Sequence, residues 1–297
     1  MSTNAMFQRI EQAIREATGE DFRIARTASA GGGCINSAYR IEGEQRVYFV
    51  KLNRRDLLSM FEAEAEGLRE IRASQTVRVP EPVCFGVAGD QAFLAMECLN
   101  LRSGRSISDR LLGRQLAAMH GISQPHFGWH RHNTIGSTPQ PNPRSEDWAD
   151  FWARHRLGFQ LELAADQGYG GRLQRSGEKL LERLPALFAG HRPGPSLLHG
   201  DLWSGNYACD ESGQPVIFDP ACYYGDREAD LAMTELFGGF GGDFHAAYRE
   251  AFPLDGGYAV RKILYNLYHV LNHLNLFGGG YLGQAEGMID RLLAETG

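Results

Sequence analysis

The pattern of apolar and polar residues divides the chain into a first third rich in short strands and a longer remainder dominated by helices. Apolar residues three or four positions apart predict helices over 7–17 and 56–71, the second of them capped by Asp56. Short apolar runs between glycines and prolines predict strands instead. These expected strands cover residues 23–30, 38–41, 46–52, 83–87 and 92–98.

The remainder of the chain shows mainly helical spacing. A short hairpin is expected within it, with strands around Ala208 and over 216–218. The proline-rich stretch 121–144 has no regular period and predicts no helix or strand. We therefore expect an α+β chain of two lobes, a small β-rich N-lobe over 1–99 and a larger, mainly helical C-lobe over 100–297. The helices expected in the C-lobe cover 106–120, 148–166, 172–187, 258–277 and 285–295.

Composition and charge exclude several classes of partner. The 297 residues can bury a full core, and the net charge of −6 argues against broad binding to nucleic acid or to an anionic membrane. The five cysteines are scattered and form no C-x-x-C pair, which favours free thiols in a reducing compartment. The sequence shows neither a secretory leader pattern nor an apolar run of about 18 residues, so we expect a cytoplasmic protein.

Three polar residues of the C-lobe have the spacing of a phosphoryl-transfer site. Asp201 lies in the sequence H-G-D, Asn206 follows five residues later, and Asp219 comes after the apolar run 216–218. Protein kinases place a base, an asparagine and a metal-binding aspartate at similar spacing. Although a lone loop aspartate or asparagine more often caps a turn, the joint spacing predicts an ATP-dependent kinase of bilobal, protein-kinase-like fold. In it Asp201 is the base, and Asn206 and Asp219 bind Mg²⁺.

A lysine at the end of the third expected strand fits the same chemistry. In kinases such a lysine contacts the α- and β-phosphates of ATP and pairs with a helix glutamate. Lys51 has this position, and Glu64 and Glu62 in the following helix are the possible partners. Glu64 is favoured, because it is expected on the same inward face as Phe61 and Leu68.

A glycine-rich segment joins the first two expected strands, where its backbone amides could approach phosphates. The pattern is not G-x-G-x-x-G, because Asn36 occupies the sixth position. Cys34 would lie beside phosphate-binding amides, which makes it a candidate redox-sensitive thiol. It is equally well interpreted as a small loop residue without a functional role. The nucleotide-binding candidates of this segment are Gly31, Gly32, Gly33, Cys34 and Asn36.

Two polar residues of the helix expected over 148–166 are candidates for the acceptor pocket. Arg156 and Gln160 stand four positions apart and so share one helix face. Most of the neighbouring aromatic residues are expected in the core. We therefore predict that Arg156 and Gln160 line the pocket for the second substrate.

Taken together, these motifs resemble the fructosamine-3-kinase, or ketosamine-3-kinase, family, which is related in fold to aminoglycoside phosphotransferases and choline kinases. The resemblance covers nearly the whole chain, and H-G-D-L-W-S-G-N followed by D-P-A-C-Y-Y-G-D-R-E-A-D-L-A-M is highly specific to this family. The matching segments are 31–36, 49–52, 61–68, 195–206, 218–233 and 276–279.

The resemblance implies ATP-dependent phosphorylation of the 3-hydroxyl of a ketosamine, free or on a protein lysine, which leads to deglycation. It also implies that Trp203 either stacks on the sugar or packs under the catalytic loop, and that Asp230 steadies that loop. Some family members use the cysteine of the glycine-rich loop in a reversible intermolecular disulfide. The protein is therefore expected as a monomer or a homodimer, and Cys34 is the candidate for a redox-linked dimer. The residues matching the adenine-binding hinge are Met96, Glu97, Cys98 and Leu99.

Three other functions are compatible with part of these motifs. A kinase of the aminoglycoside or choline type would retain the ATP site and act on another hydroxylated amine. A nucleotide-binding regulatory module without turnover is disfavoured because Lys51, Asp201, Asn206 and Asp219 are all present. A protein kinase is disfavoured because no A-P-E segment follows Asp219.

Overall fold

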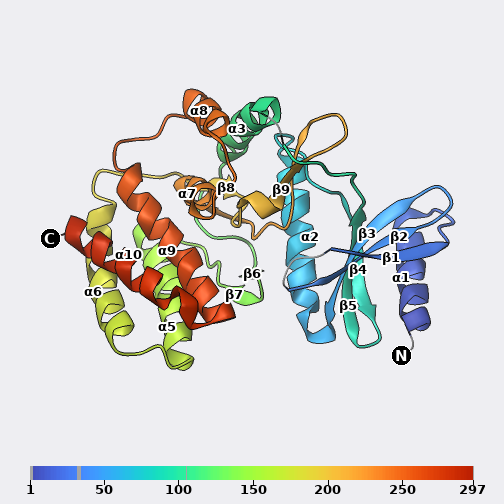
Figure 1. Ribbon diagram of the computed structural model, residues 1–297, viewed down its shortest axis with the longest axis horizontal. Helices are drawn as coiled ribbons and strands as arrows, with labels where there is room; N and C mark the ends of the chain where they lie inside the picture. The colour runs from blue at the N-terminus through green and yellow to red at the C-terminus, as the bar shows by residue number, and fades with distance from the viewer. Residues whose placement is uncertain (1–2, 32–34, 105, 297) are drawn as a thin grey trace.

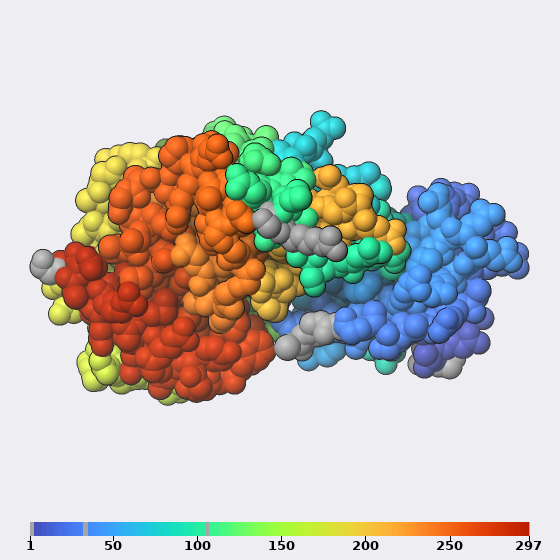
Figure 2. Space-filling model, turned by 45° about the horizontal axis from the view of Figure 1, so that its top comes forward, coloured from blue at the N-terminus to red at the C-terminus, as the bar shows by residue number. Residues whose placement is uncertain are grey.

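The two lobes lie end to end in the computed structural model, which describes residues 3–31, 35–104 and 106–296. The N-terminus lies at the outer end of the small lobe and the C-terminus at the opposite end of the molecule (Figure 1). The surface is hollowed where the blue strands of the N-lobe face the orange and red helices of the C-lobe (Figure 2).

The N-lobe is an antiparallel sheet with strand order β1-β2-β3-β5-β4, covered by one helix on each face (Figure 1). Side chains alternate between these helices: on β5, Phe93 and Ala95 belong to the core beneath α1, whereas Leu94 and Met96 belong to the core beneath α2. The elements are α1 (Thr3–Thr18), β1 (Arg26–Ala30), β2 (Ser37–Glu42), β3 (Val47–Arg54), α2 (Leu58–Ala73), β4 (Pro82–Ala88) and β5 (Gln91–Glu97).

Helix α2 lies between the sheet and the C-lobe and is tied to the C-lobe by polar contacts (Figure 1). The Glu66 carboxylate accepts hydrogen bonds from His130 and Arg131, each 2.7 Å long. The Glu70 carboxylate accepts a 2.7 Å hydrogen bond from the Tyr224 hydroxyl. These contacts link α2, which packs on the sheet of its own lobe, to the C-lobe as well.

The C-lobe is built around α9, which is buried on most of its circumference between α5, α7 and α10 (Figure 1). A helix that is buried on nearly every side is typical of a domain centre. The helices of this lobe are α3 (Ser106–His120), α4 (Trp148–Trp152), α5 (Phe159–Asp166), α6 (Arg172–Leu187), α7 (Glu228–Leu236), α8 (Gly242–Ala251), α9 (Tyr258–Phe277) and α10 (Leu282–Glu295).

Three short antiparallel strand pairs position the loops at the lobe junction. They join β8 (Ser196–Leu198) to β11 (Tyr223–Gly225), β9 (Tyr207–Cys209) to β10 (Pro215–Ile217), and β6 (Asn133–Ile135) to β7 (Thr138–Gln140). The first two pairs bring the loop 199–206, between β8 and β9, beside the segment 218–222, between β10 and β11.

Most of the expected elements are present, and the helices 106–120, 172–187 and 258–277 have the expected bounds. The cap assigned to Asp56 is wrong: Asp56 lies in a 3₁₀ turn before α2 and pairs with Arg54 at 2.6 Å. The expected helix 148–166 is interrupted by a π-helical turn over Ala153–Gly158. The sequence reading also missed α7, α8 and the β6–β7 hairpin.

Within the described part of the chain, no helix combines the length and the apolar character that crossing a membrane requires.

Candidate active site

The loop 199–206 is anchored from below by a buried carboxylate. Asp230 of α7 is 1% exposed and accepts backbone hydrogen bonds from His199 and Gly200, both 2.8 Å long. The ring of His120 contacts Asp230 at 3.1 Å and the Tyr248 hydroxyl at 2.7 Å. Because this carboxylate and its partners are buried together, the loop has little freedom to shift.

His199 is a structural residue of this loop. Its Nδ1 accepts a 3.2 Å hydrogen bond from the Asp201 amide, so its Nε2 carries the proton that it donates to the Phe218 carbonyl oxygen at 2.9 Å. Burial lowers the pKa of His199, which keeps the ring neutral in this tautomer. The ring therefore links the loop to the segment before Asp219.

The backbone at Gly200 requires glycine. Its φ is +83°, and a Cβ placed there would lie 2.1 Å from the carbonyl oxygen of Ala221. The close approach is reinforced by a 2.8 Å hydrogen bond from the Ala221 amide to the His199 carbonyl oxygen. The loop 199–206 and the segment 218–222 are thus in direct backbone contact.

Asp201 and Asn206 face each other across the loop. The Asn206 Nδ2 donates to the Asp201 carbonyl oxygen at 2.8 Å and to its side-chain Oδ2 at 3.3 Å. Burial and the negative charge of Asp219 raise the pKa of Asp201 to about 7, although the hydrogen bond from Asn206 opposes the shift. A carboxylate with its pKa near neutrality is suited to exchange protons with a hydroxyl group.

Lys51 joins the two lobes at the site. Its Nζ donates to Glu64 Oε1 and to Asp219 Oδ1, each at 2.6 Å. Burial lowers the pKa of Lys51, but the charges of Asp219 and Glu64 outweigh burial and raise it. Glu62, the alternative partner, instead contacts Arg131 at 3.4 Å.

Asp219 has an uncommon backbone conformation, with φ of +58°. Only one other described non-glycine residue, Gln75, has a positive φ. Such a conformation costs free energy in an aspartate and persists where its surroundings hold it. Here it directs the carboxylate toward Lys51 and the lobe junction.

The donor set of Asn206 and Asp219 fits a divalent cation. Because Asn206 Nδ2 donates to Asp201, its Oδ1 is the atom left to accept, and Asp219 offers Oδ2 beside the oxygen that Lys51 binds. An amide oxygen and a carboxylate oxygen are hard ligands of the kind that Mg²⁺ prefers. These two residues could therefore hold the metal that the sequence pattern predicts.

The nucleotide-binding candidates lie at the N-lobe side of the junction. Gly32, Gly33 and Cys34 fall outside the described residues. Gly31 directly follows β1, and the space beside it is open, because a Cβ placed there would have no non-adjacent neighbour within 4 Å among the described residues. Asn36 is held by Asn53, whose Nδ2 donates to Asn36 Oδ1 at 2.7 Å.

The hinge candidates lie at the end of β5. Met96 is 3% exposed and packs in the core beneath α2, while Cys98 and Leu99 are half-buried. The Glu97 amide already donates to the Glu81 carbonyl oxygen at 2.8 Å. That amide is therefore committed to the N-lobe, and any contact with a base would use other groups of this segment.

Arg156 and Gln160 do not line an open pocket, contrary to the prediction from their spacing. Both side chains are 0% exposed. The Arg156 guanidinium donates to the Pro141 carbonyl oxygen at 2.7 Å and to Asn142 Oδ1 at 2.6 Å, and Gln160 Nε2 donates to Asn272 Oδ1 at 3.2 Å. Spacing of four shows that two residues share a helix face, but not that the face is open.

Trp203 is the exposed aromatic residue of the loop 199–206, with 39% of its surface accessible. Its ring lies over Gly205, where a Cβ would be 2.2 Å from the indole. The indole therefore rests on the loop backbone and keeps part of its surface open, two residues after Asp201. This position is compatible with contact to a substrate as well as with packing on the loop.

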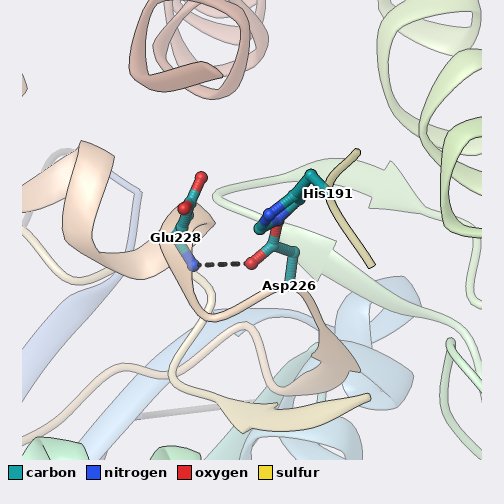
Figure 3. Close-up of side chains that lie close together, drawn as sticks. All are labelled: His191, Asp226 and Glu228. Atoms are coloured by element: carbon teal, nitrogen blue, oxygen red, sulfur yellow. Dashed lines mark hydrogen bonds and ion pairs between the residues drawn. The ribbon is translucent and has the colours of Figure 1, made fainter. Parts of the chain in front are cut away.

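A second polar cluster lies away from this site, at the start of α7 (Figure 3). Ligand atoms of His191, Asp226 and Glu228 lie within 4.8 Å of one another, as in a metal site. However, Arg261 donates to both Glu228 oxygens, at 2.7 and 2.9 Å, and His191 Nε2 contacts Asp226 at 2.6 Å. Because a guanidinium already supplies the positive charge, we interpret the cluster as an ion-pair network.

This cluster should make stability depend on pH. Burial lowers the pKa of His191, but hydrogen bonds and charges from Asp226, Glu228 and Asp255 outweigh burial and raise it. The charged ring thus contributes stability that is complete below the unfolded pKa, about 6.5, and is lost as the pH rises through the folded pKa. Replacing His191 by glutamine is expected to lower the thermal midpoint more at about pH 6 than at about pH 8. An equal loss at both pH values would contradict the protonated state of the ring.

The chain is similar to known proteins over nearly its whole length. The fructosamine kinase family model matches residues 6–295. A probable ketoamine kinase from Synechocystis is 48% identical, with 99% of both chains covered. A chloroplastic protein-ribulosamine 3-kinase from Oryza sativa subsp. japonica is 44% identical, over 93% of this chain and 81% of the relative.

Solved structures give the same result. A crystal structure from Haemophilus somnus, assigned as a fructosamine-3-kinase, superposes with a TM-score of 0.90 at 30% identity, covering 98% of each chain. An aminoglycoside phosphotransferase in complex with AMP-PNP and hygromycin B superposes with a TM-score of 0.63 at 16% identity, covering 96% of this chain and 97% of that one, and so shows the shared protein-kinase-like fold alone. The family match over nearly the whole chain, with relatives above 40% identity, shows that this protein belongs to the fructosamine kinase family.

Proposed function

We propose that the protein transfers the γ-phosphoryl group of ATP to the 3-hydroxyl of a ketosamine. The observation that carries the proposal is the meeting of Lys51, Asp201, Asn206 and Asp219 at the lobe junction of a fructosamine kinase family member. Relatives named as ketoamine kinase and protein-ribulosamine 3-kinase support a ketosamine as the acceptor.

In this mechanism Asp201 accepts the hydrogen bond of the acceptor hydroxyl and takes its proton as the phosphoryl group moves. Asn206 keeps the carboxylate oriented by its bond to Asp201. Lys51, held by Glu64, contacts the nucleotide phosphates and stabilises their negative charge. Each of these groups is fixed before the substrates arrive, so little reorganisation is needed in the transition state.

Asn206 and Asp219 would hold Mg²⁺ together with the phosphates of ATP. When bound, the metal neutralises charge on the transferring group. Trp203 would contact the sugar, which its partial exposure next to Asp201 supports. The 3-phosphate makes the adduct unstable, so the amine is released and the reaction amounts to deglycation.

We place this reaction in the reducing environment of the cytoplasm. The described cysteines, Cys84, Cys98, Cys209 and Cys222, are all free thiols. A redox-linked homodimer through Cys34 remains a separate proposal, because that residue lies outside the described part of the chain.

The test measures Mg²⁺-dependent ATP consumption with ribulose-lysine, fructose-lysine, kanamycin and choline side by side. NMR of the product locates the new phosphate. We expect turnover with the ketosamines and phosphate on carbon 3 of the sugar. Turnover with kanamycin or choline alone would show that the acceptor is another hydroxylated amine and not a ketosamine. Nucleotide binding without turnover on any acceptor would contradict the proposal that the protein is an enzyme.

A further inference from the structure

The β6–β7 hairpin lies between the two lobes (Figure 1). At its tip, Gly136 has φ of +61°, and a Cβ there would lie 2.8 Å from Ile35 and 3.1 Å from Leu276. Ile35 belongs to the glycine-rich segment 31–36, and Leu276 lies in the last turn of α9. The hairpin therefore fills the junction between the N-lobe loop and the C-lobe.

The base of the hairpin holds the segment that follows Asp219. Gln140 Nε2 donates to the Ala221 carbonyl oxygen at 3.1 Å, and Asn133 Nδ2 donates to the Cys222 carbonyl oxygen at 2.8 Å. Gln140 is 0% exposed and Asn133 is 9% exposed. Two buried side-chain amides thus bond the backbone two and three residues beyond the predicted metal ligand.

These amides belong to a continuous buried network. Gln140 Oε1 accepts a 2.7 Å hydrogen bond from the Tyr268 hydroxyl of α9, and Gln140 Nε2 also donates to Asn133 Oδ1 at 2.9 Å. Asn142 donates to the same Asn133 oxygen at 2.8 Å and accepts from Arg156 at 2.6 Å. Each amide orientation is therefore set by its neighbours, as satisfied buried networks require.

Arg156 joins this network through its hydrogen bond to Asn142. Its guanidinium carbon lies 4.1 Å from the centre of the Tyr223 ring, and Tyr223 immediately follows the held carbonyl of Cys222. Among the described residues no carboxylate pairs with Arg156. Carbonyl and amide oxygens bind its terminal nitrogens and aromatic faces lie against the guanidinium, while its buried Nε has no hydrogen-bond partner in the described part of the chain. This arrangement accounts for the burial that excluded Arg156 from the substrate pocket.

The opposite edge of the same segment is held by the catalytic loop, through the bond from the Ala221 amide to the His199 carbonyl oxygen. The chain just after Asp219 is thus fixed on both edges, by the loop on one side and by the hairpin on the other. A left-handed aspartate needs such support, because its conformation is unfavourable by itself.

We propose that Gln140 and Asn133 are positioning residues that hold Asp219 in its left-handed conformation, and thereby set metal affinity at the site. The proposal rests on the assignment of Asp219 as a ligand in the proposed function. Neither residue touches the reacting atoms. Their effect passes through the backbone of residues 219–222, as outer partners of metal ligands commonly act.

The test uses Gln140→Leu with Gln174→Leu as a matched control. Gln174 on α6 also donates from its amide to two backbone carbonyl oxygens, those of Leu161 and Tyr169, at 3.0 and 2.9 Å. Binding of Mn²⁺ to the full-length protein saturated with AMP-PNP is measured by electron paramagnetic resonance, and the thermal midpoint is recorded for each variant.

Gln140→Leu is expected to weaken Mn²⁺ binding about 10- to 100-fold, whereas Gln174→Leu lowers the thermal midpoint with unchanged Mn²⁺ binding. Tyr268→Phe removes only the hydroxyl that orients Gln140 and should weaken Mn²⁺ binding in the same direction by a smaller factor, which keeps the test decisive if Gln140→Leu fails to fold. Unchanged Mn²⁺ affinity in folded Gln140→Leu, or in Tyr268→Phe should Gln140→Leu not fold, would overturn the proposal.

The Mn²⁺ measurement needs no acceptor, so it separates the two proposals. If the wild-type protein shows no turnover with ketosamines but its Mn²⁺ affinity still depends on Gln140, the proposed function is contradicted while this inference is supported. With an active wild type, the inference also requires kcat to fall with Mn²⁺ affinity in Gln140→Leu while KM for the ketosamine stays constant.

Discussion

Asp201→Asn is expected to lower turnover by about 10²- to 10⁴-fold while nucleotide binding stays close to that of the wild type. Asparagine has nearly the same shape and can still accept the hydrogen bond from Asn206, but it cannot take a proton from the acceptor hydroxyl. Lys51 and the predicted metal ligands are unchanged by the substitution. The measurement combines steady-state kinetics with calorimetric titration of AMP-PNP.

Asp147→Asn provides the control for this substitution. Asp147 caps α4 by accepting a 2.8 Å hydrogen bond from the Asp150 amide, a role that asparagine also fulfils. It should retain wild-type turnover. Residual activity of Asp201→Asn above a few per cent of wild type would remove Asp201 from the role of base.

The largest loss of stability is expected from Arg261→Met. Arg261 and Glu228 have side chains only 4% and 2% exposed, and the guanidinium binds both carboxylate oxygens. Removing the guanidinium deprives the buried Glu228 carboxylate of both hydrogen bonds and leaves the nearby His191 as a remaining positive neighbour. Breaking a buried pair in this way typically costs about 3–5 kcal/mol. Urea unfolding followed by circular dichroism gives the change in the free energy of unfolding.

A second variant distinguishes lost charge compensation from lost packing. Adding Glu228→Gln to Arg261→Met removes the unpaired carboxylate and should restore a large part of the stability. Both proteins are compared at a temperature well below their midpoints. A destabilisation below about 1 kcal/mol, or a double variant as unstable as Arg261→Met, would contradict a buried charge pair in this cluster.

Much of the fold could be predicted because the longest helices carry a clear apolar period. Helix α9 shows this best, since its residues follow helical spacing over 258–277 without a glycine or proline. Helix α7 was missed because its polar residues Glu228, Asp230 and Thr234 are buried together with the apolar ones, so polar positions in this segment do not mark a solvent-facing side. The π-helical turn over Ala153–Gly158 changes the spacing locally and cannot be read from apolar positions.

The candidate site was predictable where its chemistry is local in sequence. Asp201 and Asn206 lie five residues apart in one loop, and the face shared with Leu68 favoured Glu64 as the partner that contacts Lys51 in the structure. Their catalytic and metal-binding roles stay predictions. Asp230 was expected to support the catalytic loop from the family resemblance, and it binds that loop in the structure. Its partner His120 and the hairpin residue Gln140 were not predicted, because they join distant segments: His120 reaches Asp230 across 110 positions, and Gln140 reaches Ala221 across 81.

The hydrogen bonds between α2 and the C-lobe bear on how the activity of the enzyme could be regulated. Glu66 and Glu70 fasten this helix to the C-lobe through His130, Arg131 and Tyr224, and the same helix carries Glu64. Kinases that are switched by phosphorylation swing the corresponding helix to break and remake its pair with the lysine. Here that swing would first have to detach the helix from the opposite lobe. We therefore expect an enzyme that is assembled in its working form as soon as it folds, with its flux set by the supply of acceptor and nucleotide.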